Sequence, residues 1–91
     1  MGLKSTTVCL GYQQITSLSA STALTVPSGA TLAVIIPESQ AVRWRDDGTA
    51  PTGSVGMPLA IATTLSYDGD LSRIRFIEQA ASAKLNVSYY A

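Results

Sequence analysis

The chain is a succession of short β-prone runs, each bounded by turn-forming residues. The clearest run, residues 84–90, alternates polar and apolar side chains, which is the period of a strand with one buried face. Residues 41–46 alternate in the same way. No stretch keeps the 3.6-residue period of a helix over a convincing length. With about seven or eight such runs, the sequence predicts an all-β fold, namely a small antiparallel β-sandwich that is jelly-roll-like.

The length of 91 residues predicts one domain, residues 1–91, because a chain this short buries a limited fraction of its surface. Residues 1–30 carry one charge and many Ser and Thr, so they form either an extended arm or peripheral strands. Residues 31–36 are continuously apolar and end at Pro37, which predicts a strand covered on both faces. A small sandwich covers one face only. We therefore expect a loop, the N-terminal segment or a neighbouring subunit on the other.

The C-terminal third predicts a meander of three consecutive antiparallel strands. An Asp-Gly dipeptide at residues 68–69 is typical of a type I′ hairpin turn, and this register places Ile61 opposite Phe76. A loop at residues 79–82 then places Phe76 opposite Leu85. In both pairings the apolar residues share one face, as a half-buried sheet requires.

Charge is sparse. Charged residues make up 13% of the chain, hydrophobic residues 46%, and the formal net charge is zero. Such a surface promotes association, so we expect other subunits to cover part of it. The absence of a basic excess argues against a nucleic-acid partner, and no apolar run approaches the length of a membrane span. The single cysteine, Cys9, is predicted to be a small buried apolar residue.

Residues for catalysis or for a cofactor are missing from the composition. Histidine is absent, and one cysteine cannot build a zinc site or be activated by an imidazole. No phosphate-binding or nucleophile-elbow motif occurs. The Asp-Gly segments at residues 46–48 and 68–70 are either Ca²⁺ ligands or plain turns, and the turn is favoured. We therefore predict no enzymatic activity, no cofactor and no metal.

All four arginines lie in two tripeptides, residues 43–45 and 73–75, in which an apolar residue separates two arginines. In an extended strand each pair of guanidinium groups points to one side and the apolar residue to the other. The arginines either pair with nearby carboxylates or reach a carboxylate of a neighbouring subunit, where bidentate geometry gives specificity. Tyr90, at the end of the last run, faces outward and is the more exposed aromatic candidate. The predicted interface residues are Arg43, Arg45, Arg73, Arg75 and Tyr90.

Residues 40–52, 55–59, 67–77 and 83–90 resemble a group of small proteins encoded by tailed bacteriophages and prophages. The most distinctive part is WRDDG at residues 44–48 followed by VGMPL at residues 55–59. Members of this group are generally treated as phage proteins of structural or unknown role. The resemblance implies a virion component, made in the cytoplasm of the bacterial host, and it implies no catalytic residues.

From these observations we predict a phage virion structural protein, and more narrowly a capsid decoration or cement protein. Its expected partners are other copies of itself and the major capsid protein, with neither nucleic acid nor membrane involved. The alternative is a tail, fibre or host-surface recognition module that binds carbohydrate. That alternative needs exposed aromatic rings, whereas Trp44 alternates with Val42 and is predicted to face the core.

Overall fold

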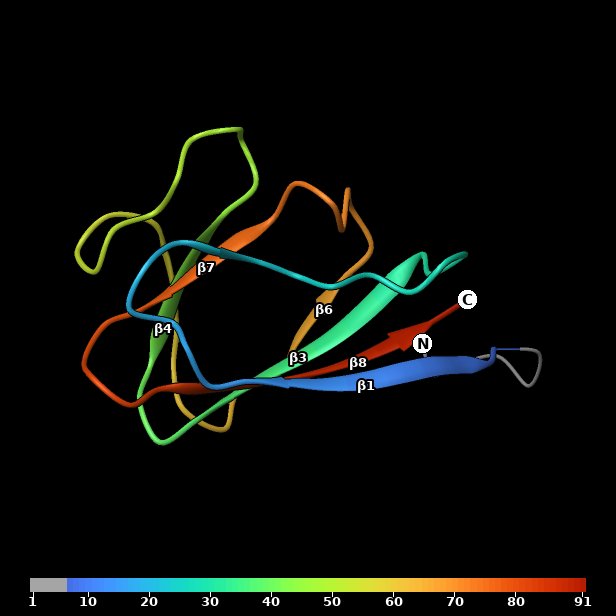
Figure 1. The fold of residues 1–91 in the computed structure, drawn as a ribbon, viewed down its shortest axis with the longest axis horizontal. Helices are drawn as coiled ribbons and strands as arrows, with labels where there is room; N and C mark the ends of the chain where they lie inside the picture. Colours follow the sequence, from blue (N-terminus) through green and yellow to red (C-terminus); the bar gives the residue numbers. More distant parts are fainter. Residues whose placement is uncertain (1–6) are drawn as a thin grey trace.

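The protein folds into two β-sheets packed face to face (Figure 1). The computed structural model describes residues 7–91, which contain eight strands and no helix. All strand pairs are antiparallel, and the sheet orders are β1-β8-β3-β6 (sheet A) and β2-β7-β4-β5 (sheet B). In chain order the strands are β1 Cys9–Ile15, β2 Thr22–Ala23, β3 Leu32–Glu38, β4 Val42–Arg45, β5 Met57–Leu59, β6 Leu65–Tyr67, β7 Arg75–Glu78 and β8 Lys84–Tyr90. The predicted all-β sandwich is confirmed.

The strand pairs are nested around the loop of residues 46–56. The first strand pairs with the last (β1 with β8), the second with the seventh, the third with the sixth, and β4 with β5. The chain therefore runs like one long hairpin whose two arms roll up into two sheets. This is the jelly-roll connectivity, which confirms the predicted jelly-roll-like character.

The core lies between the sheets and comes from alternate residues of each strand. In β8 the odd-numbered residues are buried and the even-numbered ones are partly exposed, as the sequence alternation predicts. Sheet B contributes Val42 and Phe76, and Ile74 joins them from just before β7, all with no exposed surface. Burying each such side chain stabilises the fold by about 1.5–3 kcal/mol. The facing side chains of sheet A include Ala33, Ile35, Leu85, Val87 and Tyr89.

The predicted C-terminal meander is wrong. β6 pairs with β3 in sheet A, whereas β7 pairs with β2 and β4 in sheet B, so no hairpin joins them. Phe76 lies opposite Trp44 and Thr22, not opposite Ile61 or Leu85, and Ile61 is 50% exposed. The loop at residues 79–82 crosses between the sheets, because β8 belongs to sheet A. Pairing with distant strands buries both Phe76 and Leu85. A local meander would bury them too, so their apolar character does not distinguish the two arrangements.

The Asp-Gly signal at residues 68–69 has another cause. Neither residue has the positive φ that a type I′ turn needs. Instead, the ring of Tyr67 lies so close to Gly69 that a Cβ there would collide with it. Glycine is required for this close approach and not for a hairpin.

β3 also departs from expectation. It continues through Pro37, whose carbonyl accepts a hydrogen bond from the Ala62 amide (2.9 Å). Its burial alternates: Ala33, Ile35 and Pro37 are buried, whereas Leu32, Val34 and Ile36 are half-buried on the outer face. The two layers formed by residues 7–91 thus leave one side of this apolar strand partly open to solvent.

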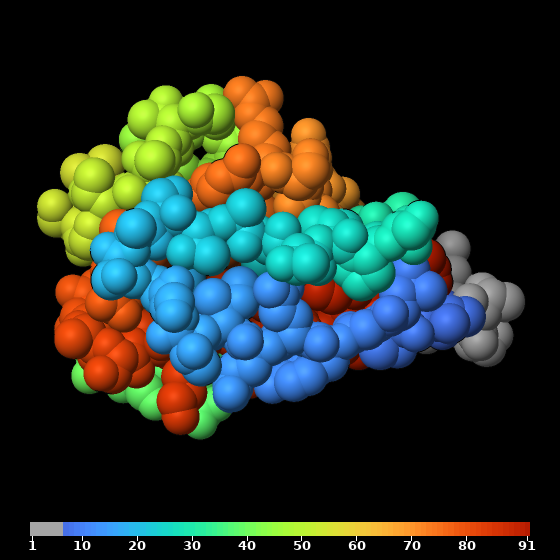
Figure 2. Space-filling view, in the orientation of Figure 1, coloured from blue at the N-terminus to red at the C-terminus, as the bar shows by residue number. Residues whose placement is uncertain are grey.

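The N-terminal strands form sheet edges. β1 is an edge strand of sheet A, and β2 is an edge strand of sheet B. The part of the prediction for residues 1–30 that concerns residues 1–6 lies outside the described residues. The segment after β2 runs along β1 (Figure 2), where the Thr25 amide donates to the Gln13 side chain (3.2 Å). Cys9 is exposed, so the prediction that it is buried is wrong. Pro58 lies on the edge strand β5, as a residue without an N–H donor should.

Candidate interaction surfaces

The outer face of sheet B gathers three arginines. Val42 and Phe76 turn into the core, so Arg43, Arg45 and Arg75, their neighbours along β4 and β7, face outward. Arg45 and Arg75 are directly opposite across the two strands. Like charges in this position repel each other unless a counter-charge is near. We call this surface the arginine face; its outward residues are Ala23, Arg43, Arg45, Pro58, Arg75 and Ile77.

Arg45 has its own counter-charge. Its guanidinium binds both carboxylate oxygens of Asp47, with Nε donating to Oδ1 at 3.0 Å. This hydrogen bonding holds the pKa of Asp47 at about 2, and the Thr49 amide, which also donates to Asp47, adds to the shift. Arg45 is therefore a surface bridge of the kind that the sequence left open.

Arg43 supports a loop. Its Nη1 donates to the Gly56 carbonyl at 2.8 Å, and a Cβ at Gly56 would press on the Arg43 side chain and the Trp44 carbonyl. Gly56 also has a φ of 142°, which side chains rarely adopt. Arg43 Nε is buried without a hydrogen-bond partner among residues 7–91. This arginine therefore anchors the end of the loop of residues 46–56 and offers little of its guanidinium to a partner.

Arg73 does not come from a strand. It lies in a turn in which its amide donates to the Asp70 carbonyl (3.0 Å), so residues 73–75 are not one extended run as predicted. Its guanidinium packs against the backbone of Gly48, where a Cβ would lie 2.7 Å from Nη2. Gly48 thus allows the loop and the turn to approach each other.

Arg73 and Arg75 share a cleft of about 170 Å³. No acidic residue lines it. Arg75 Nη1 donates to the Ser72 carbonyl (2.9 Å) and the Ile74 carbonyl (3.2 Å), which fixes the guanidinium at the cleft. Hydrogen bonds from Ser72 and the charges of Arg73 and Arg75 lower the pKa of Asp70, which is near both arginines but outside the cleft lining. Within the cleft the two guanidinium groups meet no carboxylate and can bind one supplied from elsewhere. The lining residues are Ser21, Gly48, Thr49, Ala50, Arg73 and Arg75.

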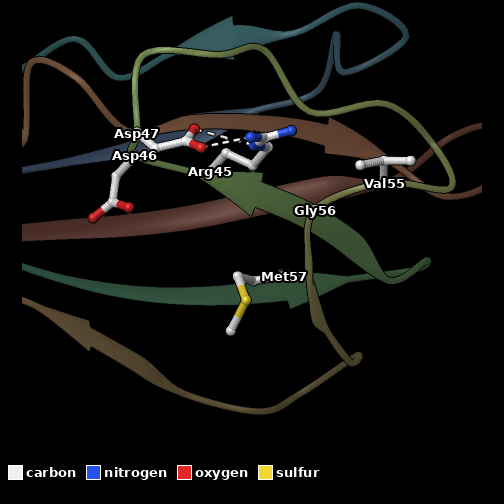
Figure 3. A pocket seen from close by; sticks show the side chains of 6 residues that line it. All are labelled: Arg45, Asp46, Asp47, Val55, Gly56 and Met57. Carbon is white, nitrogen blue, oxygen red and sulfur yellow. Dashed lines mark hydrogen bonds and ion pairs between the residues drawn. The ribbon is translucent and has the colours of Figure 1, made fainter.

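A second cleft, of about 270 Å³, opens beside the Arg45–Asp47 pair (Figure 3). Val55 and Met57 give it apolar walls, and Asp46 points away from the ion pair. Asp46 accepts a hydrogen bond from the Tyr67 hydroxyl at 2.6 Å. Burial and this carboxylate raise the pKa of Tyr67 to about 12.

Trp44 packs against the core and meets Tyr67 edge to face, with ring centroids 6.0 Å apart. It is half-buried on the inward side of β4, in agreement with its predicted direction. Its ring therefore does not form an open stacking platform on the arginine face.

Tyr90 lies on the other sheet, so the five predicted residues do not form one surface. The outer face of sheet A is a hydrogen-bonded ladder along β8. Asn86 accepts from the Tyr12 hydroxyl (2.6 Å) and from Gln14 (3.1 Å), and it donates to Glu38 (3.1 Å). Further along, Ser88 donates to the Tyr90 hydroxyl at 3.2 Å. Sequence reasoning missed Tyr12 and Asn86, because only the β1–β8 register brings them together.

This outer face carries almost no charge. Its charged residues are Glu38 and Lys84, which are opposite each other at one end of the register. An aliphatic row along β3 flanks the ladder. We call it the neutral face; its outward residues are Cys9, Tyr12, Gln14, Leu32, Val34, Ile36, Glu38, Ser66, Lys84, Asn86, Ser88 and Tyr90.

Within residues 7–91 there is no group of three or more residues of the types that hold a metal ion, and no helix that could cross a membrane. The acidic oxygens of the two Asp-Gly segments are partly engaged, since Asp47 binds Arg45 and Asp70 accepts from Ser72. Comparison with protein-family models, with curated proteins and with solved structures finds no match to this chain.

Proposed function

We propose that this protein is a structural component of a tailed-phage virion, specifically a decoration protein that binds the head shell across joints between major capsid subunits. The observation that carries the proposal is the cleft in which Arg73 and Arg75 converge without a lining carboxylate. A carboxylate of a capsid subunit would complete it with charge-assisted hydrogen bonds. The proposal includes no catalytic step and no cofactor.

The motif behind the phage resemblance is the segment that organises this surface. In WRDDG, Trp44 packs on Tyr67, Arg45 binds Asp47, and Gly48 makes room for Arg73. Asp46 holds the Tyr67 hydroxyl. The string therefore shapes the arginine face and both clefts, as expected of a motif that serves an interface.

Such a protein would stabilise the shell because many copies bind it together. One cleft that binds one carboxylate is weak, but many copies on a shell add their contacts, because the binding of each neighbour is effectively intramolecular. A joint bridged in this way must lose the contacts before it opens, so the shell resists expansion and heat.

The test uses particles that lack this protein and purified variants added back. Arg73→Gln with Arg75→Gln removes both cleft charges, and occupancy should fall by about tenfold or more, because charge-assisted hydrogen bonds contribute about 1.5–3 kcal/mol each. Asp68→Asn, which removes one charge from an exposed loop residue outside both faces and both clefts, should leave occupancy nearly unchanged. Thermal unfolding checks that each variant is folded. Unchanged occupancy of the double variant would refute the role of the cleft.

Immunogold labelling of intact particles separates this proposal from its alternative, a tail or host-recognition module. The larger cleft, with Asp46 and Asp47 beside apolar Val55 and Met57, favours that alternative, because carboxylates next to apolar walls suit sugar hydroxyls and ring faces. Label over the head supports decoration, and label confined to the tail supports recognition. Absence of label, with the antigen shown to be accessible, would exclude both.

A further inference from the structure

We infer that the neutral face is the surface through which copies of this chain bind one another, while the arginine face is left for the shell. The inference deepens the proposed function, because it assigns the self-contact of the decoration protein to one sheet. It concerns the isolated protein, so it is testable without particles.

Charge selects the occupant. The neutral face carries one positive and one negative residue, Lys84 and Glu38, at one end, so a second copy meets no net repulsion there. The arginine face carries three outward arginines, of which Arg45 is paired with the margin carboxylate Asp47, so among the described residues a positive excess remains there. Two such faces brought together would place like charges close to each other, which opposes their association. Self-association is therefore favoured on sheet A and opposed on sheet B.

The apolar row supplies the driving force. Leu32, Val34 and Ile36 alternate with the buried residues of β3 and remain half-buried, although β3 is flanked by strands on both sides. A strand that is apolar on both sides is typical of a sheet covered on both faces. Residues 7–91 supply two layers, and a second copy would supply the third.

Polar side chains of the neutral face are already held by hydrogen bonds, which lowers the entropic cost of association. Tyr12 is 64% exposed, yet its hydroxyl is already bound to Asn86, and the Tyr90 hydroxyl is bound by Ser88. Side chains held before association lose less conformational entropy on binding. Tyrosine also provides contact area at low entropic cost.

Size sets the strength. The three long strands of sheet A, at about 4.8 Å spacing and 3.3 Å per residue, present roughly 330 Å² in projection. Stable interfaces bury about 800 Å² on each partner, so we expect weak association in solution that becomes effective when copies are side by side on a shell. The experiment must therefore reach millimolar protein.

The experiment is sedimentation velocity from about 10 μM to 1 mM on three proteins, a range that covers weak association. The unsubstituted protein should show a rising weight-average sedimentation coefficient. Val34→Glu, which places a charge at the centre of the neutral face, should weaken self-association by more than about tenfold. Ala23→Glu adds the same charge to the arginine face and should associate like the parent. A parent that stays monomeric at 1 mM, or a Val34→Glu variant that associates like the parent, would overturn the inference.

Cys9 reports which face is in contact. Its thiol is exposed and shares the face of Tyr90. Its alkylation rate should fall with protein concentration in the parent and stay constant in Val34→Glu. Full reactivity in associated protein would place the contact elsewhere and refute the inference.

The two proposals fail separately. Association in solution without binding to particles would refute the proposed function and leave the self-contact standing. Binding to particles by a protein that stays monomeric at 1 mM would do the reverse.

Discussion

The two outer faces of the sandwich arise from the same alternation of side chains along their strands, but they differ in charge and in hydrogen bonding. Along β8 and along β4, alternate residues turn inward and the others turn out. On sheet A the outward residues bond to one another, as Asn86 does with Tyr12 and Gln14. On sheet B the outward arginines are bound mainly by loops, as Arg43 is by Gly56. Strand periodicity thus decides which residues face out, and loops decide what those residues can bind.

Removal of the shared core should break both faces together and have the largest effect. Phe76 has no exposed surface and lies between Trp44 and Thr22 in sheet B. Phe76→Ala should lower the free energy of unfolding by about 3–5 kcal/mol, through lost burial and a cavity. Urea denaturation measures it. A loss below about 1 kcal/mol would mean that the two sheets do not depend on this ring for packing.

High pH should weaken the fold through two tyrosines of sheet A, Tyr67 in β6 and Tyr89 in β8. Burial raises the pKa of Tyr89 to about 12, and burial with Asp46 does the same for Tyr67. Since both pKa values lie above those of an unfolded chain, their stabilisation is complete below about pH 10 and is lost as the pH rises toward 12. The urea midpoint should fall over that window. Tyr67→Phe should reduce the fall, and an unchanged profile in that variant would contradict the contribution of Tyr67.

A pair of glycine variants distinguishes the effect of Arg73 position on binding from a general loss of stability. Gly48 and Gly29 have nearly equal positive φ values, 88° and 87°. Either glycine replaced by alanine should cost about 1 kcal/mol of stability for that conformation. Only at Gly48 would the new Cβ displace Arg73, whereas at Gly29 the nearest atom, Leu10 Cδ1, is 4.0 Å away. Gly48→Ala should therefore also reduce binding to particles, and equal binding by both variants would show that the position of Arg73 is unimportant.

The smallest effect is expected at low pH, on one face only. The Arg45 bridge holds the pKa of Asp47 at about 2, so its stabilisation is present above about pH 4 and is lost as the pH falls toward 2. The Thr49 amide, which donates to Asp47, should report this titration by NMR, whereas the Ser88 amide on sheet A should not follow it. A Thr49 midpoint near pH 4 would mean that the bridge does not form in solution.

Sequence periodicity predicted local direction well and strand pairing poorly. Residues 84–90 and 42–45 face as their alternation indicates, because one buried sheet face is enough to impose that period. The local sequence of a strand does not specify its partner. β7 pairs with β4 and β2, and no turn motif in the sequence indicates either pairing. The clefts cannot be predicted from the sequence for the same reason, because Arg73 contacts Gly48 only in the folded sandwich. The arginines were found because a tripeptide pattern marks them, whereas the polar ladder needed the register of β1 on β8.

The nested pairing has a consequence for how the protein is made. β1 pairs with β8, so sheet A cannot close until residues 84–90 have left the ribosome. Folds dominated by such distant contacts form in milliseconds to seconds, slower than helical bundles of the same size. Until then the uncharged edge of β1 and the apolar run of β3 remain exposed together on a growing chain. The yield of folded protein should therefore depend on how quickly residues 84–90 follow the rest of the sandwich out of the ribosome.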